Sequence, residues 1–113
     1  MEVCLNFPRK GEYIAVNLSP TAGHEQQGYR PALVVSENLL NRHGLVWVLP
    51  ITNTLHGPGR FVLPVGEPVQ GAVLFTQLRT LDLAARSFVS KGVASDEVLD
   101  EALGKVAAVL GIG

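Results

Sequence analysis

The chain has 113 residues, of which 47% are hydrophobic, and its formal net charge is −1. A chain of this length is expected to form one domain that buries roughly 65% of its unfolded surface, enough for a core without disulfides. The near-neutral charge excludes a protein that coats duplex nucleic acid, although a local basic groove remains possible because six of the nine basic residues are arginine. The single cysteine and the lack of a leader or a long apolar run predict a cytoplasmic protein without a membrane segment.

Short apolar runs separated by turn residues predict strands. We expect five main strands and a weaker sixth, at residues 13–18, 31–36, 45–51, 60–65, 72–76 and 87–91. No repeat or linker divides the chain, so residues 1–113 are read as a single, mainly β domain, a small barrel with a C-terminal helix. Several runs are continuously apolar, which predicts that both faces are covered, by the barrel interior or by a second subunit.

Two helices are expected. Residues 36–44 begin with a capping serine and end with glycine, which is typical of a short connecting helix. Ser95 is expected to cap a longer helix with two acidic residues in its first turn. Its apolar stripe predicts packing on the barrel or on a partner, and barrel packing is preferred; it comprises Val98, Leu99, Ala102, Leu103, Val106, Val109 and Leu110. Gly104 within this helix suggests that another backbone approaches closely there.

The glycine-punctuated loop before the second strand holds the most chemically versatile side chains, His24, Glu25 and Arg30. They supply an imidazole with an ordinary pKa of about 6.5, a carboxylate and a permanent cation. Together they could supply the base, the acid and the cationic support that transfer of a phosphate group needs. The alternative is structural, because Arg30 and Glu25 could simply pair to order the loop.

A second polar segment ends the third strand at residues 50–54, where Thr52 and Asn53 emerge from an apolar run. Their hydroxyl and amide groups could hydrogen-bond a phosphate. The structural alternative is that Thr and Asn form a turn through bonds from their side chains to the backbone.

A third polar segment spans residues 77–86 and begins with Gln77. Arg79 and Arg86 bracket Asp82 there, and a salt-bridged turn would explain the arrangement. Elsewhere, His43 and His56 lack the spacing of a metal site, so neither a metal nor another cofactor is predicted.

In order and spacing, these segments resemble the MazF/PemK/ChpB family of toxin endoribonucleases, and the resemblance covers nearly the whole chain. The shared motifs are Gly-His-Glu-Gln-Gln-Gly at 23–28, Arg-Pro-Ala at 30–32, Pro-Ile-Thr at 50–52, Gln-x-Arg-Thr-x-Asp at 77–82 and Ala-Arg at 85–86. The chain looks most similar to the PemK (Kid) and ChpB branches. The resemblance implies an SH3-like barrel, a homodimer, and the toxin of a type II toxin-antitoxin system with a cognate antitoxin protein.

The resemblance also implies a metal-independent, sequence-specific endoribonuclease that cuts single-stranded mRNA and leaves a 2′,3′-cyclic phosphate and a 5′-hydroxyl. Arg30 would stabilise or protonate the reacting group, Thr52 would orient it, and Glu25 and His24 would take part in proton transfer or position the substrate. The side chains expected to bind substrate are His24, Gln27, Asn53, Gln77, Arg79 and Arg86.

The chain departs from the family pattern at a few positions. Leu74 and Thr76 stand where the Kid branch carries Arg and where many members carry Asp, and Leu83 replaces a common tryptophan. The loop at residues 55–59 is shorter than in ChpB-like members, so its target sequence is expected to differ. Because of these departures, two alternatives stay open: a non-catalytic, CcdB-like inhibitor of a protein such as DNA gyrase, and a degenerate RNA-binding dimer.

Overall fold

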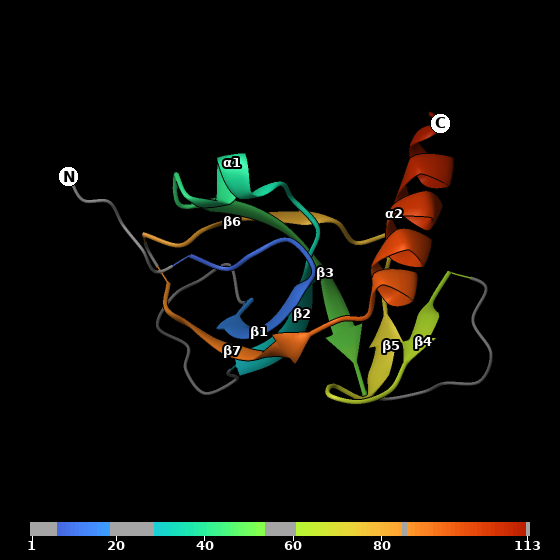
Figure 1. Cartoon of the computed structure of the whole chain (residues 1–113), viewed down its shortest axis with the longest axis horizontal. Coiled ribbons are helices and arrows are strands. Elements are labelled where there is room, and N and C mark those ends of the chain that lie inside the picture. Colours follow the sequence, from blue (N-terminus) through green and yellow to red (C-terminus); the bar gives the residue numbers. More distant parts are fainter. Residues whose placement is uncertain (1–6, 19–28, 54–60, 85, 113) are drawn as a thin grey trace.

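Figure 1 shows the computed structural model, which describes residues 7–18, 29–53, 61–84 and 86–112. Within these ranges the chain forms seven strands and two helices. In chain order they are β1 (Glu12–Asn17), β2 (Tyr29–Val34), α1 (Asn38–Asn41), β3 (Leu45–Thr52), β4 (Leu63–Val65), β5 (Gly71–Val73), β6 (Arg79–Asp82), β7 (Phe88–Val93) and α2 (Asp96–Leu110).

The strands form one antiparallel sheet in the order β4-β5-β3-β2-β1-β7, and β6 also pairs with β3. β3 is the longest strand, with 8 residues, and lies at the centre of the sheet. One of its edges pairs first with β6 and then with β5, while its other edge pairs with β2. The sheet curves into a half-barrel with α2 along one side (Figure 1), which confirms the prediction of a mainly β domain with a C-terminal helix.

The sheet is apolar on both faces. Alternation along β1 and β2 sends Tyr13 and Leu33 to one face and their neighbours Ile14 and Val34 to the other. The core between the first face and α2 contains Tyr13, Leu33, Val35, Leu49, Ile51, Leu63, Val73, Phe75, Ala94 and, on α2 itself, Ala102. The concave face encloses Ile14, Val16, Leu18, Ala32, Val34, Val46, Val48 and Leu81. The described chain therefore covers both faces of these strands itself.

Helix α2 begins and packs as its sequence predicts. Ser95 caps it by accepting a hydrogen bond from the Val98 backbone N–H at 3.1 Å. The packed side chains are Val98, Leu99, Ala102, Leu103 and Val106. The last turn does not pack on the sheet, since Val109 and Leu110 are exposed where the helix extends past it (Figure 1). Apart from the backbone of α2 itself, a Cβ at Gly104 would meet no atom of the described chain within 4 Å, so the close approach predicted there does not come from this part of the chain.

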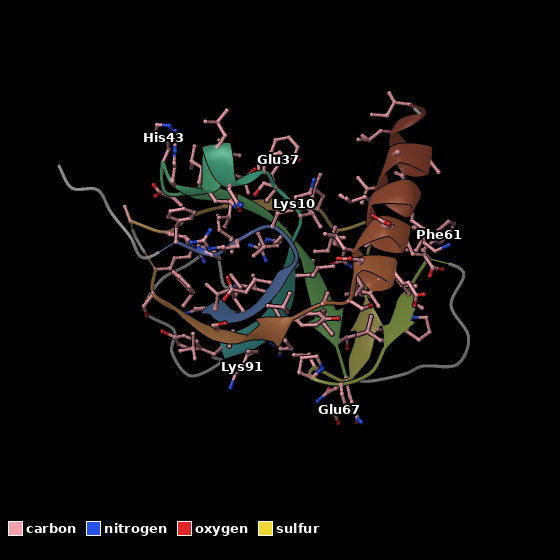
Figure 2. All side chains as sticks on the ribbon, viewed as in Figure 1. Lys10, Glu37, His43, Phe61, Glu67 and Lys91 are labelled. Atoms are coloured by element: carbon pink, nitrogen blue, oxygen red, sulfur yellow. The ribbon has the colours of Figure 1, made fainter. Side chains whose placement is uncertain are left out.

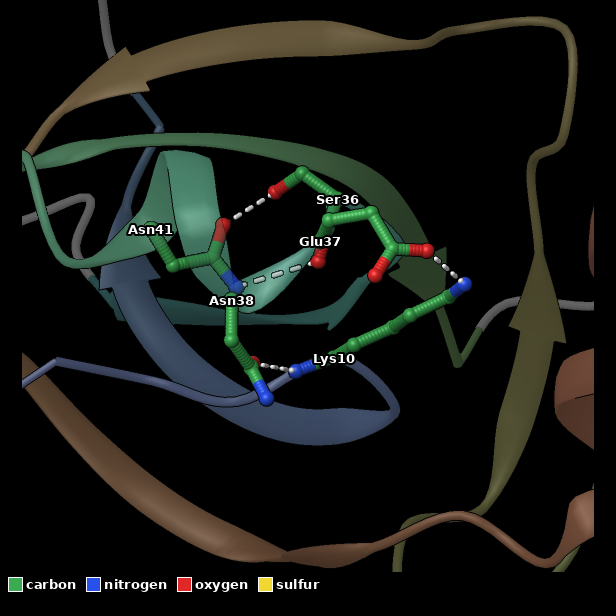
Figure 3. Close-up of polar contacts among 5 residues, drawn as sticks. All are labelled: Lys10, Ser36, Glu37, Asn38 and Asn41. Carbon is green, nitrogen blue, oxygen red and sulfur yellow. Dashed lines mark hydrogen bonds and ion pairs between the residues drawn. The ribbon is translucent and has the colours of Figure 1, made fainter.

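The connecting helix is shorter than predicted, and Ser36 does not cap it. The Ser36 hydroxyl instead donates to the Asn41 side-chain oxygen (Figure 3). It also accepts a hydrogen bond from the Trp47 backbone N–H at 2.9 Å. Asn41, which is fully buried, completes the arrangement by donating to the Ser36 carbonyl at 3.0 Å. These bonds fix α1 to the start of β3.

A second, more exposed set of contacts ties the N-terminal turn to the same helix (Figure 3). The Lys10 backbone N–H donates to the Asn38 side-chain oxygen at 2.8 Å. The Lys10 ammonium lies 2.5 Å from a Glu37 carboxylate oxygen, and the Glu37 side chain is 73% exposed. An ion pair this exposed stabilises a fold little, so the buried Ser36 and Asn41 pair is the stronger link.

The strand predictions differ from the structure mainly after β3. β4 and β5 are shorter than expected, and residues 79–82 form a strand, β6, where a salt-bridged turn seemed sufficient. Leu81 is buried against Val46 while its neighbours are less buried, so this strand alternates despite its polar sequence. No helix among the described residues is long and apolar enough to span a membrane.

Candidate functional site

Two of the predicted catalytic residues lie at one edge of the sheet, the lower edge in Figure 1, where β2 begins and β3 ends. Arg30 is the second residue of β2 and is exposed. Thr52 is the last residue of β3 and is half-buried, and Asn53 follows it in an exposed position. The last β2–β3 pair is Ala32 with Pro50, so Arg30 and Thr52 both lie just beyond the paired part of these strands.

Strand alternation places both residues on the concave face. Arg30 is two residues from Ala32, Thr52 is two residues from Pro50, and these partners share a face. On β1, Arg30 pairs with Val16, a buried member of the concave core. The guanidinium therefore belongs to the rim of the half-barrel, where a permanent cation with five donors is suited to a phosphate.

A second guanidinium is held close to the start of β2. The Arg86 Nη1 atom donates a hydrogen bond to the Asn17 carbonyl oxygen, and Asn17 pairs with Tyr29, the neighbour of Arg30. The Tyr29 side chain is 53% exposed, and its hydroxyl lies 2.6 Å from the Ser87 hydroxyl. This bond orients an exposed aromatic ring, which is the kind of surface on which nucleic-acid bases stack.

Arg79 and Gln77 are farther from this edge. Arg79 begins β6 and pairs with Val48, four residues before Thr52, which corresponds to about 13 Å along the strand. Gln77 is exposed between β5 and β6, where its backbone N–H donates to the Leu74 carbonyl at 3.0 Å. Arg79 shares the concave face with Arg30 and Thr52, but not their position along it.

The structure therefore brings together four of the residues predicted from the sequence: Arg30, Thr52, Asn53 and Arg86. His24, Glu25 and Gln27 lie outside the described residues. Leu74 lies near the site, because its backbone N–H donates to the Pro50 carbonyl at 2.8 Å. Among the described residues, no group of three His, Cys, Asp or Glu side chains could hold a metal ion.

β5 approaches the end of β3 very closely. A Cβ at Gly71 would lie 2.5 Å from the Thr52 carbonyl oxygen, and the φ of Gly71 is +151°. Beside this contact, a hollow of about 360 Å³ opens between the end of β3 and the β4–β5 turn. Its described lining residues are Asn53, Pro64, Val65, Gly66, Gln70 and Gly71.

Sequence reasoning missed Tyr29 and Gln70 at this edge. Tyr29 had a usable signal, because it is an aromatic residue directly beside the key arginine of a polar loop. Gln70 had no sequence signal, because its segment contains no motif. Only the pairing of β4 with β5 brings Gln70 to this edge.

The half-barrel with its C-terminal helix is a fold shared with MazF toxins of known structure. The crystal structure of MazF from Deinococcus radiodurans superimposes with a TM-score of 0.80 and 37% identity, covering 95% of this chain and 99% of that one. A MazE-MazF crystal structure from the same organism gives a TM-score of 0.81 and 30% identity, covering 96% and 99% of the two chains.

The sequence comparison is more specific than the fold. The profile of a family described as "PemK-like, MazF-like toxin of type II toxin-antitoxin system" matches residues 9–110. Endoribonuclease toxin ChpB from Escherichia coli (strain K12) is 42% identical over 109 residues, covering 89% of this chain and 92% of ChpB. The chain belongs to the PemK/MazF family of toxins.

Proposed function

We propose that this chain is the toxin of a type II toxin-antitoxin system and an endoribonuclease that cuts single-stranded mRNA at specific sequences without a metal. The family match and the endoribonuclease relative support this proposal. The observation that carries it is the meeting of Arg30 and Thr52 at one edge and on one face of the sheet.

The proposed reaction uses the substrate's own nucleophile. Glu25 accepts the proton of the 2′-hydroxyl, whose oxygen attacks the phosphorus and forms the 2′,3′-cyclic phosphate. The 5′ oxygen leaves and takes a proton from a neighbouring acid, and His24 is an imidazole in the same loop that suits this step. Arg30 neutralises charge that builds up on the phosphorane, and Thr52 orients the phosphate. Because guanidinium keeps its proton, stabilisation is the role that suits Arg30.

The remaining predicted residues are proposed to hold the RNA on either side of the cut. Arg86 and Asn53 lie at the same edge as Arg30 and Thr52 and would bind the adjacent nucleotides, as would Gln27 from the same loop as Glu25. Gln77 and Arg79 would contact RNA farther along the concave face, because about 13 Å of strand separates Arg79 from Thr52.

We further propose that the active form is a cytoplasmic homodimer bound and inhibited by a cognate antitoxin protein. The MazE-MazF crystal structure supports an antitoxin partner. Exposed apolar side chains on β3 and at the end of α2 offer a surface for a second chain, namely Leu45, Trp47, Val109, Leu110 and Ile112.

The test is cleavage in the presence of excess chelator. We expect the purified chain to cut a mixed-sequence single-stranded RNA and to leave a cyclic phosphate at each cut. A 2′-deoxy substitution at a cut site should abolish that cut. Arg30→Ala should lower kcat/KM by about 100-fold or more, because a preorganised charge at the phosphorane is lost.

Arg30→Lys is the matched control, since it keeps the charge and loses the planar fork, and it should retain more activity than Arg30→Ala. Both variants should unfold at the wild-type temperature because Arg30 is exposed. Intact RNA across a broad sequence pool would contradict the proposal. Tight, salt-dependent RNA binding would then indicate a non-cutting RNA-binding dimer, and gyrase inhibition that survives Arg30→Ala would indicate the CcdB-like alternative.

A further inference from the structure

The hollow beside Thr52 differs in character from the arginine-rich rim. None of its described lining residues carries a charge, and two of them, Asn53 and Gln70, end in amides. Pro64 and Val65 add apolar surface. Amides above an apolar wall match the edge and face of a nucleobase.

Two glycine contacts hold the hollow in a fixed position relative to Thr52. The absence of a side chain at Gly71 lets β5 lie against the Thr52 carbonyl. The β4–β5 turn also packs against β7, because Pro68 of the turn contacts Gly92. A Cβ at Gly92, whose φ is +114°, would lie 2.7 Å from the Pro68 Cγ atom. The hollow is therefore built from contacts across three strands and is preorganised.

Gln70 gives the hollow a hydrogen-bond acceptor, and Glu67, which is not part of the lining, holds this side chain. The Gln70 Nε2 atom donates to a carboxylate oxygen of Glu67 at 3.3 Å, which leaves the Gln70 Oε1 atom as an acceptor. Figure 2 shows Glu67 at the lower edge of the molecule, where β3 ends. The amide oxygen attracts N–H donors, and the nearby carboxylate repels a phosphate.

We propose that this hollow binds the base of a nucleotide next to the cut phosphate and that Gln70, held in place by Glu67, selects a base with an exocyclic amino group. Adenine, cytosine and guanine each present such a donor. Uracil instead flanks its single N–H with two carbonyl oxygens, which would face the Gln70 acceptor. This inference rests on the proposed function and names the substrate feature that the site reads.

The test is the base composition around the cuts in a randomised single-stranded RNA, read by sequencing the cleaved ends. Wild-type protein should show one position beside the cut that is depleted in uracil. Glu67→Gln removes the carboxylate that holds the Gln70 amide, so this amide is free to turn its N–H donors toward the base, and uracil at that position should rise by about tenfold while other positions stay unchanged. Glu101→Gln, the same change on the exposed face of α2, should leave the whole profile unchanged.

A binding measurement separates this inference from the proposed catalysis. Short 2′-deoxy oligonucleotides lack the nucleophile and cannot be cut by this chemistry, so differences in affinity between them report base selection without cleavage. Among oligonucleotides that differ only in this base, the one with uracil should bind most weakly. Glu67→Gln should reduce the difference in affinity between uracil and the other three bases. Equal affinities, or a uracil-depleted position that is unaffected by Glu67→Gln and Gln70→Ala, would overturn the inference even if the RNA is cut.

Discussion

At the scale of single residues, some positions of the candidate site could be identified from the local sequence, whereas others are recognised only in the folded structure. Arg30 and Thr52 could be selected from the sequence because each is a polar residue at the boundary of an apolar run. Their position on one face also follows from strand alternation once the register is known. Gln70 and Gly71 could not be selected, because their roles depend on β5 lying against the end of β3.

Gly104 gives a prediction at this scale. Its position inside α2 is exposed, and a Cβ there would meet no atom of the described chain within 4 Å. Gly104→Ala should therefore raise the free energy of unfolding by about 0.5–1 kcal/mol, because alanine restricts the unfolded chain and favours the helix. Urea denaturation measures this change. A loss of stability together with weaker self-association would show instead that a second copy packs against the glycine.

At the scale of elements, strand β6 and the role of Ser36 were not predicted, because both lie in polar segments of the sequence. β6 carries a charge at each end, which favoured a turn, yet the apolar Leu81 between the polar Thr80 and Asp82 was a sequence signal of alternation. Ser36 has the residue type of a helix cap, but α1 begins later, and the Ser36 hydroxyl instead accepts a hydrogen bond from the backbone of β3. Ser95 could be predicted because its helix is long and its cap is followed by acidic residues.

The link between α1 and β3 predicts unequal mutational effects. Asn41 is fully buried and bonded on both sides of its amide, so Asn41→Ala should lower the free energy of unfolding by about 1–3 kcal/mol. Lys10→Gln, which removes the exposed ion pair to Glu37, should lower it by less than about 1 kcal/mol. Chemical denaturation of both variants provides the comparison. A larger effect for Lys10→Gln would show that the exposed pair is the main link.

At the scale of the whole molecule, the continuous apolar runs correctly indicated a sheet that is covered on both faces. They did not show what covers it. In the structure the curvature of the half-barrel closes one face and α2 closes most of the other, so these buried strands do not by themselves require a second subunit. Periodicity cannot separate these cases, because a buried face looks the same in sequence whatever packs on it.

The buried core makes stability depend on pH at the alkaline end. Burial raises the pKa of the Tyr13 hydroxyl above its ordinary value of 10.0. The folded chain therefore keeps this proton at a pH where the unfolded chain loses it, so the free energy of unfolding falls as pH rises past about 10. Tyr13→Phe should make this fall less steep while leaving the acid side unchanged. Identical slopes for both proteins in urea titrations at pH 9 to 11 would contradict the prediction.

β3 belongs to both cores. Val46 and Val48 pack in the concave core, while Leu49 and Ile51 pack beneath α2. Local unfolding of either core would remove β3 from the other core as well. The free energy of partial unfolding is therefore high wherever unfolding begins. A protease that cleaves only unfolded chain would therefore encounter either the folded or the fully unfolded protein. Digestion should proceed without long-lived fragments.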